Sequence, residues 1–175
     1  PACRNRPAAY RAARSIFLFK AAGRDLILNY KYGKNPFLAP VLARRLVEQG
    51  GKWYQWGEYD LLVPVPLHPR KRRERGFDQS RLLAARLSRL TGIPVAYGRL
   101  RRIRYTTTQT RLTARQRREN IRSAFRITDP GYFRDRRVLL VDDVFTTGAT
   151  VDECARVLNR AGAGRVDVLT AARAV

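Results

Sequence analysis

The chain has 175 residues, 45% of them hydrophobic, and carries 36 Lys and Arg against 14 Asp and Glu. This length suits one α/β domain with its own core and is short for two domains. No stretch is long and apolar enough to cross a membrane and no secretory signal pattern is present, so we expect a cytoplasmic protein. The two cysteines, Cys3 and Cys154, are too few for a disulfide framework.

The formal net charge of +22 predicts anionic partners, either phosphates on a substrate, nucleic acid, or both. Only five of the basic residues are Lys, so a coding bias can explain the choice of Arg. Such a bias does not explain the scarcity of acids. The alternative is a solvated basic surface without a dedicated partner.

The N-terminal segment is interpreted as a linker or the remnant of something upstream. Residues 1–13 are rich in Arg and Ala and have no clear periodicity, whereas residues 15–29 are apolar with interruptions. A turn signal with Gly and Pro follows at 31–36. We therefore assign residues 1–25 to a linker and the start of the domain, and residues 26–175 to the domain proper.

Residues 37–49 are predicted to form an amphipathic helix that Gly50 and Gly51 end. Its apolar stripe consists of Leu38, Val41, Leu42, Leu46 and Val47. An aromatic cluster of Trp53, Tyr54 and Trp56 comes next. The cluster indicates a packed loop, with a base-stacking platform as the alternative.

A strand is predicted over 60–66, and its prolines near the end indicate that it stops at a functional loop. Residues 67–75 are that loop, and they are strongly basic. An amphipathic helix follows over 76–91, with Gly92 closing it. Its inward residues are predicted to be Leu82, Leu83, Leu87 and Leu90.

The middle of the chain alternates short elements with polar segments. A strand is expected over 93–100, and residues 101–118 are basic and rich in Thr. Within that segment, Thr113 and Gln116 have capping-box spacing, so a helix is predicted to start at Ala114 and run toward Ser123. A short strand over 124–128 and a turn at 129–131 complete this part.

The last third supplies the strongest pattern. Residues 138–141 form a buried strand, and a helix over 150–161 is predicted to bury Val151, Cys154, Ala155 and Leu158. A final strand is expected over 165–170. Alternating strands and helices with right-handed crossovers predict an α/β fold with a parallel sheet and helices on both faces.

The turn between strand and helix has the chemistry of a ribose-phosphate site. Backbone N–H groups and hydroxyls gather there at a helix N-terminus, and this arrangement suits a phosphate monoester. The residues that supply them are Thr146, Thr147, Gly148, Ala149 and Thr150. Asp142 and Asp143 precede the turn; they repel phosphate and suit ribose hydroxyls or a metal ion. The alternative is an ordinary strand–turn–helix with a surface acid pair.

Residues 138–150 resemble, along their whole length, the thirteen-residue phosphoribosyl pyrophosphate (PRPP) signature of the type I phosphoribosyltransferases. The wider chain resembles the ComF family of phosphoribosyltransferase-like competence proteins over roughly residues 26–173. The matching segments are Leu26–Ile27, Lys31–Gly33, 63–69, Arg72, 75–79, 109–113 and 117–120. Several motifs that agree in order are more specific than any one alone.

The resemblance implies a type I phosphoribosyltransferase fold with a mobile hood over the site. Residues 105–118, which include Thr108, Gln109 and Arg111, correspond to this hood. It implies Mg²⁺ carried with PRPP, which Asp142 and Asp143 contact indirectly. The basic loop has donors suited to pyrophosphate, namely Leu67, His68, Arg70, Lys71 and Arg72. The alternative for the basic loop is a solvated basic turn, and the alternative for the hood is a disordered surface loop. His68 either shapes its loop or touches the ligand.

Members of the ComF family usually begin with a zinc ribbon of paired cysteines. Cys3 alone cannot build a tetrahedral zinc site, so we expect no zinc in this chain as given. Either the ribbon lies outside the given chain or this member lacks it.

Three functions follow as hypotheses. The first is Mg²⁺-dependent phosphoribosyl transfer to or from a nitrogen nucleophile. The second is a PRPP- or nucleotide-sensing protein whose basic surface holds single-stranded DNA; the family's link with natural transformation implies this role and a DNA-uptake machinery as partner. The third is a structural adaptor with an inactive site, which the intact acid pair and phosphate turn disfavour.

Overall fold

The computed structural model describes residues 7–33, 35–105 and 114–174. Its centre is a four-stranded parallel sheet in the order β1 (Ala13–Leu18), β6 (Arg165–Arg173), β5 (Arg137–Phe145) and β2 (Leu61–Pro64). β5 and β6 are the two central strands, and β5 pairs with β6 from Arg137 to Phe145. The parallel sheet predicted from the alternation of elements is confirmed.

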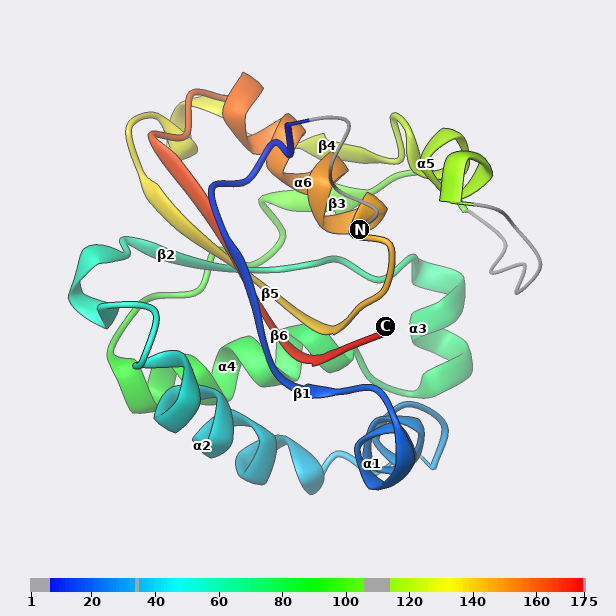
Figure 1. Ribbon diagram of the computed structural model, residues 1–175. Coiled ribbons are helices and arrows are strands. Elements are labelled where there is room, and N and C mark those ends of the chain that lie inside the picture. The colour runs from blue at the N-terminus through cyan, green and yellow to red at the C-terminus, as the bar shows by residue number, and fades with distance from the viewer. Residues whose placement is uncertain (1–6, 34, 106–113, 175) are drawn as a thin grey trace.

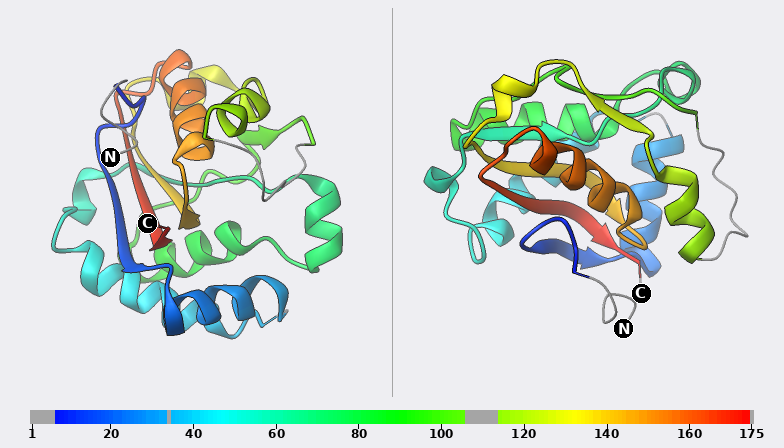
Figure 2. Two further views of the ribbon diagram at one scale, coloured as in Figure 1. Left: turned by 45° about the vertical axis from the view of Figure 1, so that its right-hand side comes forward. Right: turned by 90° about the horizontal axis from the view of Figure 1, so that it is seen from above.

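Helices cover both faces of the sheet, as Figures 1 and 2 show. One face carries α1 (Ala21–Tyr32), α2 (Leu38–Gly50) and α4 (Gln79–Thr91). The other carries α6 (Ala149–Arg160), α5 (Ala114–Ile121) and a two-stranded antiparallel ribbon of β3 (Leu100–Arg102) and β4 (Phe125–Ile127). Short helices η1 (Trp56–Glu58), α3 (Pro69–Arg75) and η2 (Pro130–Phe133) connect these layers.

The apolar run of β5 explains why the sheet is buried on both sides. Val138 and Leu140 pack into the core under α6, whereas Leu139 and Val141 pack into the core under α2 and α4. A strand that faces two cores reads as a continuous hydrophobic run and not as an alternating one. The predicted inward residues of α6 (Val151, Cys154, Ala155 and Leu158) are all buried.

The observed elements differ from the predicted ones in several places. β1 was not predicted, because its burial comes from pairing with β6 and its own sequence alternates weakly. The segment 93–100 makes a single bridge, Leu62 with Val95, before it leaves the sheet. The loop predicted over 67–75 is largely the helix α3, which starts at Pro69 and ends where Gly76 adopts φ +81°. β5 continues through Phe145.

Two residues predicted to face inward are exposed. Val41 on α2 and Leu90 on α4 expose 58% and 52% of their surface, because each lies at the margin of its helix stripe. The aromatic cluster after α2 divides: Tyr54 is buried and donates its hydroxyl to the Val168 carbonyl at 2.9 Å, whereas Trp53 remains 42% exposed. The cluster is therefore mainly a packed loop, as predicted.

Among the described residues, no helix combines the length and the apolar character needed to cross a bilayer.

Candidate functional site

The carboxyl end of β5 brings the acid pair and the phosphate turn to one edge of the sheet. In open α/β sheets, ligands bind outside this edge, where strands end and helices begin. Because β5 runs on to Phe145, Asp142 and Asp143 lie within the strand and not after its end, and their side chains leave it on opposite faces. α1, α3 and the start of α6 surround the same edge (Figure 1).

Asp142 is held by hydrogen bonds within the protein. Its Oδ1 accepts from the Ser80 hydroxyl at 2.8 Å and from the backbone N–H of Asp143 at 2.9 Å. Burial, and then the negative charge of Asp143, raise the pKa of the Asp142 carboxyl. Ser80 belongs to the first turn of α4, so this helix fixes one member of the acid pair.

Asp143 is paired with a lysine from α1. Lys31 Nζ lies 2.8 Å from Asp143 Oδ1, and the two side chains are only 17% and 8% exposed. The neighbouring Tyr30 is fully buried and donates its hydroxyl to the Gln79 carbonyl at 2.8 Å. Burial, followed by the charge of Asp143, raises the pKa of Tyr30. α1 and α4 are thus tied together directly behind the acid pair.

The turn from β5 to α6 has the backbone shape of an anion-binding loop. Gly148 is the residue before α6 and adopts φ +76°, a left-handed conformation that favours glycine. A Cβ placed there would lie 2.6 Å from the Phe145 ring, so the turn also needs glycine for space. The Thr147 hydroxyl accepts from the Ala149 N–H at 3.4 Å. Thr146, Thr147 and Thr150 keep exposed or half-exposed positions beside the helix N-terminus.

His68 shapes its own segment, which agrees with one of the two roles predicted for it. Its Nδ1 accepts from the Arg70 N–H at 3.3 Å at the start of α3. Its ring stands edge-to-face with Tyr105 at 5.0 Å, and the Arg70 guanidinium lies 5.3 Å from the same tyrosine ring. Burial, followed by the charges of nearby arginines, lowers the pKa of His68, which favours the neutral imidazole.

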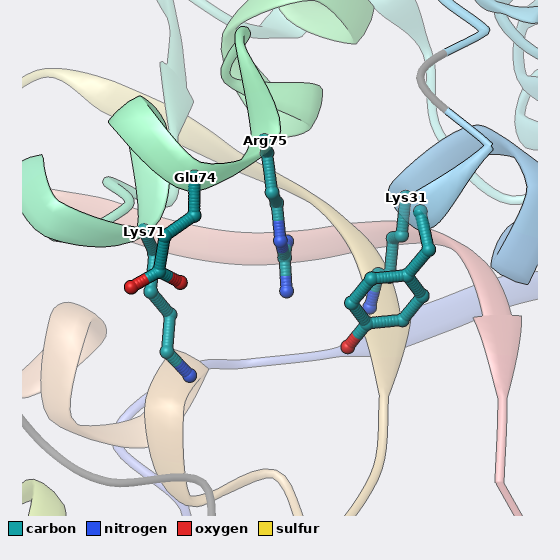
Figure 3. A pocket seen from close by; sticks show the side chains of 5 residues that line it. Lys31, Lys71, Glu74 and Arg75 are labelled. Carbon is teal, nitrogen blue, oxygen red and sulfur yellow. The ribbon is translucent and has the colours of Figure 1, made fainter.

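A pocket of about 220 Å³ lies between α3 and α1 (Figure 3). Lys71, Glu74 and Arg75 line it from α3, and Lys31 and Tyr32 line it from α1. Three cations against one acid make this space suited to a polyanion. Burial, and then the charges of Arg102 and Arg75, lower the pKa of Lys71. An anion in the pocket would offset that repulsion.

The structure brings some predicted site residues together and not others. Lys71 lines the pocket, whereas Arg70 is turned over Tyr105 and Leu67 directs its N–H to Asp78 Oδ2 at 3.4 Å. The hood residues Thr108, Gln109 and Arg111 lie outside the described residues, as does Cys3. The described part of the chain holds no cluster of three His, Cys, Asp or Glu side chains arranged to hold a metal ion.

Sequence reasoning missed five residues of this site, namely Lys31, Tyr32, Glu74, Arg75 and Ser80. Lys31, Ser80 and Arg75 touch the acid pair or line the pocket. A signal for Lys31 and Arg75 existed, since both fall in the short motifs that carry the family resemblance. No periodicity could show that a lysine of α1 reaches an aspartate more than a hundred positions later.

Comparison with known proteins decides the family. A model of the phosphoribosyl transferase domain matches residues 76–174. The chain belongs to the phosphoribosyl transferase family. Within it, competence protein F of Haemophilus influenzae is 35% identical over 153 residues, which are 85% of this chain and 67% of that protein. DNA utilization protein YhgH of Salmonella typhi is 33% identical over 169 residues, which are 95% of this chain and 74% of that protein.

These relatives confirm the predicted ComF membership, and the family match together with the parallel sheet confirms the predicted phosphoribosyltransferase-like α/β fold class. Among solved structures, the glutamine PRPP amidotransferase of Bacillus subtilis, in complex with ADP and GMP, is 25% identical. The match covers 78% of this chain and 26% of that chain at a TM-score of 0.47. Structural similarity at this level adds nothing to the family match.

Proposed function

We propose that the carboxyl edge of the sheet binds PRPP, or a closely related ribose 5-phosphate, together with Mg²⁺. The observation that carries the proposal is the juxtaposition of three parts. The acid pair of β5 lies between the Gly148 turn at the start of α6 and the cationic pocket of Lys31, Lys71 and Arg75. A 5-phosphate, a diol and a diphosphate need an anion-binding turn, two carboxylates and a cluster of cations, respectively.

Each group has a distinct role in this proposal. The backbone N–H groups around Gly148 and the flanking Thr hydroxyls bind the 5-phosphate. Asp142 and Asp143 accept hydrogen bonds from the ribose hydroxyls. Lys71 and Arg75 bind the diphosphate, and His68 positions the start of their helix.

Mg²⁺ would be held mainly by the ligand. Two carboxylates fit a hydrated Mg²⁺ that also takes phosphate oxygens, because this ion keeps several waters and seldom uses an all-protein site. When bound, Mg²⁺ neutralises charge on the diphosphate and makes it a better leaving group. Lys71 and Arg75 would stabilise the negative charge of the departing pyrophosphate, so the site needs no strong general acid.

The physiological role that we propose is service in DNA uptake, because the relatives are named competence protein F and DNA utilization protein. Phosphoribosyl transfer to a nitrogen nucleophile is the enzymatic form of the proposal. The alternative is a non-catalytic sensor of PRPP or nucleotides that binds single-stranded DNA through its basic surface. The net charge of +22 supports the DNA-binding part. The cytoplasmic location stays a prediction from the sequence.

Calorimetric titration with PRPP and Mg²⁺ tests the ligand assignment. The parent protein should bind, and D142N/D143N should bind at least tenfold more weakly, since each lost hydrogen bond to a charged group contributes about 1.5–3 kcal/mol. R24A on α1 is a matched control, because Arg24 pairs only loosely with Asp25, at 3.7 Å, on the exposed side of that helix. No heat with the parent would end the PRPP assignment. Unchanged affinity in D142N/D143N would end the roles given to the acids.

Further assays separate the enzyme from the sensor. Release of pyrophosphate in the presence of a nucleobase or amine would establish transfer. Binding of single-stranded DNA that weakens steeply as salt rises would support the sensor, because phosphate contacts release counterions. Absence of DNA binding even at low salt would contradict it.

A further inference from the structure

A second pocket, of about 360 Å³, lies on the open edge of the sheet beside β2, and the proposed function does not use it. Its walls come from the end of β2, the first turns of α3 and α4, and the segment 96–102. Among the residues that the structure describes, it shares no lining residue with the pocket of Lys31, Lys71 and Arg75. We call it the edge pocket.

Proline residues explain why a pocket forms there and not a fifth strand. On the outer side of β2, Leu62 bonds to the crossing segment, through Leu62 N–H to the Pro94 carbonyl and Ala96 N–H to the Leu62 carbonyl, both at 2.9 Å. Two residues further on, the outward position is Pro64, which has no N–H to offer. The crossing segment then diverges, and the rings of Pro64 and Pro66 remain as an apolar wall.

Arginines from three elements surround that wall. Arg72 of α3, Arg81 of α4 and Arg101 of β3 line the pocket, and all three are exposed. Among the described residues, none of the three forms an ion pair with an acid, unlike Arg99 or Arg137 elsewhere in the chain. The pocket is therefore strongly positive and accessible.

Asp78 is the one acid among the described residues that line the pocket, and the fold already uses it. Asp78 accepts from the Arg81 N–H at 3.0 Å and from the Leu67 N–H at 3.4 Å, and so caps α4. This cap anchors Arg81 at the mouth of the pocket. Asp78 is thus committed to backbone groups, and the arginines stay available to a ligand.

An aromatic platform completes the pocket. The Arg81 guanidinium lies 4.5 Å from the centre of the Tyr97 ring, and that tyrosine is 42% exposed. A guanidinium that lies with its face on a ring keeps its N–H edge free to donate to a phosphate, and the exposed part of the ring can contact a base. Arg101 is also held, since its Nε donates to the Gly98 carbonyl at 3.2 Å.

We propose that the edge pocket binds a nucleotide, with the base against Tyr97 and the proline wall and the phosphate on Arg81 and Arg101. The size supports this, because ligand pockets begin at roughly 300 Å³. The same chemistry is present in a free mononucleotide and in one unit of a single-stranded nucleic acid. This inference goes beyond the proposed PRPP site and does not depend on it.

The test is calorimetric titration of the full chain with thymidine 5′-monophosphate and, separately, with hexathymidylate. R81A and R101A should each weaken binding about tenfold, the loss expected for one charge-assisted hydrogen bond. Y97A should weaken it by a similar factor through lost stacking. R89A is the matched control: Arg89 is exposed on the same helix, outside the pocket, so the charge change is identical.

Two fragments check the division of the ligand. Thymidine lacks the phosphate and inorganic phosphate lacks the ring, so each should bind at least tenfold more weakly than the mononucleotide. If inorganic phosphate binds as well as the mononucleotide, the pocket recognises only an anion and the proposal is wrong. Mononucleotide binding identifies a free ligand as the source, whereas hexathymidylate binding alone, with the same sensitivity to R81A, identifies a polynucleotide unit.

The outcome is separable from that of the PRPP site. Mononucleotide binding that K71M abolishes and R81A leaves unchanged would place the ligand in the other pocket and overturn the inference. Equal losses in R81A and R89A would show only a general effect of surface charge and would overturn it too, as would no binding of either probe. PRPP with Mg²⁺ should bind R81A as it binds the parent.

Discussion

Replacing Lys31 by Met should destabilise the protein, and more strongly at pH 8 than at pH 5. Lys31 is the cation that compensates the acid pair, with its Nζ 2.8 Å from Asp143 Oδ1. Met keeps most of the volume of the lysine stem and removes the charge. The variant therefore isolates the electrostatic contribution from the packing of α1 against the sheet edge.

The expected loss follows from burial. Removing one partner of a buried ion pair costs about 3–5 kcal/mol, because the other charge is left without compensation. The exposed fractions of 17% and 8% show that this pair retains some contact with water, so we expect about 3 kcal/mol at pH 8. For a chain of this size, that corresponds to a fall in Tm of roughly 6–12 °C.

The pH dependence follows from Asp142. Burial and Asp143 raise its pKa in the folded protein to about 7, whereas the ordinary value is 3.8. Between those values the folded protein keeps a proton that the unfolded chain has lost, so stability falls as pH rises through this window. Lys31 opposes the shift, and K31M enlarges it. At pH 5 Asp142 is neutral in the folded state, and the cost of K31M should therefore shrink.

Urea unfolding of the parent, K31M and the control R24M at both pH values measures the effect. R24M removes a charge from the same helix at an exposed pair, which is worth about 0–1 kcal/mol. In K31M/D143N the uncompensated charge is gone, so stability should recover toward the parent. Equal losses in K31M at pH 5 and pH 8, with no recovery in K31M/D143N, would refute the electrostatic reasoning.

Three further changes have defined outcomes. G148A should lower the free energy of unfolding by about 2 kcal/mol or more and weaken PRPP binding, because Gly148 adopts φ +76° and a Cβ there would clash with the Phe145 ring. A Cβ at Gly57 would meet open space, so G57A should do little, and urea unfolding compares the two variants. D60N should cost about 1 kcal/mol at pH 7, because the guanidinium and N–H of Arg137 lower the pKa of Asp60 to about 2. The cost should shrink as the pH falls from about 4 toward 2 and vanish below that, because protonation of Asp60 then ends the pair; urea unfolding across pH measures it. Burial raises the pKa of Cys154 well above its ordinary value, so a thiol reagent should label it only on unfolding; rapid labelling of Cys154, identified by peptide mapping, would contradict the packing.

Local patterns predicted the elements whose own sequence determines their burial. β5 is an uninterrupted apolar run, and α6 has the spacing of a half-buried helix with small residues inward. The start of α5 at Ala114 followed from a capping box. β1 and α3 could not be predicted in this way. β1 is a strand only because β6 offers it a partner, and α3 is an exposed, highly charged helix of seven residues whose sequence is typical of a basic loop.

The candidate site also combines features that the local sequence predicts with contacts that depend on the tertiary fold. The acid pair and the turn around Gly148 are contiguous in the chain, so the residue types of that one segment suffice to predict their chemistry. The pairing of Asp143 with Lys31 and of Asp142 with Ser80 joins three elements, and only tertiary packing brings them together. The edge pocket is even harder to predict from the sequence, because its arginines come from α3, α4 and β3. Its shape also depends on where a neighbouring segment leaves β2.

The placement of the acids indicates what the excess of arginine is for. Acids outside the site are mostly committed to the fold: Asp167 accepts from Tyr59 and pairs with Arg11 and Arg165, Glu153 accepts from the Ser123 N–H, and Asp78 caps α4. With 36 basic residues against 14 acids, one-to-one pairing could neutralise fewer than half of the basic residues. A net charge this far from zero opposes compaction through self-repulsion, so the unpaired arginines do not serve stability. Arginines concentrate around the edge pocket, and Lys31, Lys71 and Arg75 concentrate beside the acid pair. Anionic ligands at two separate sites would require this distribution of positive charge.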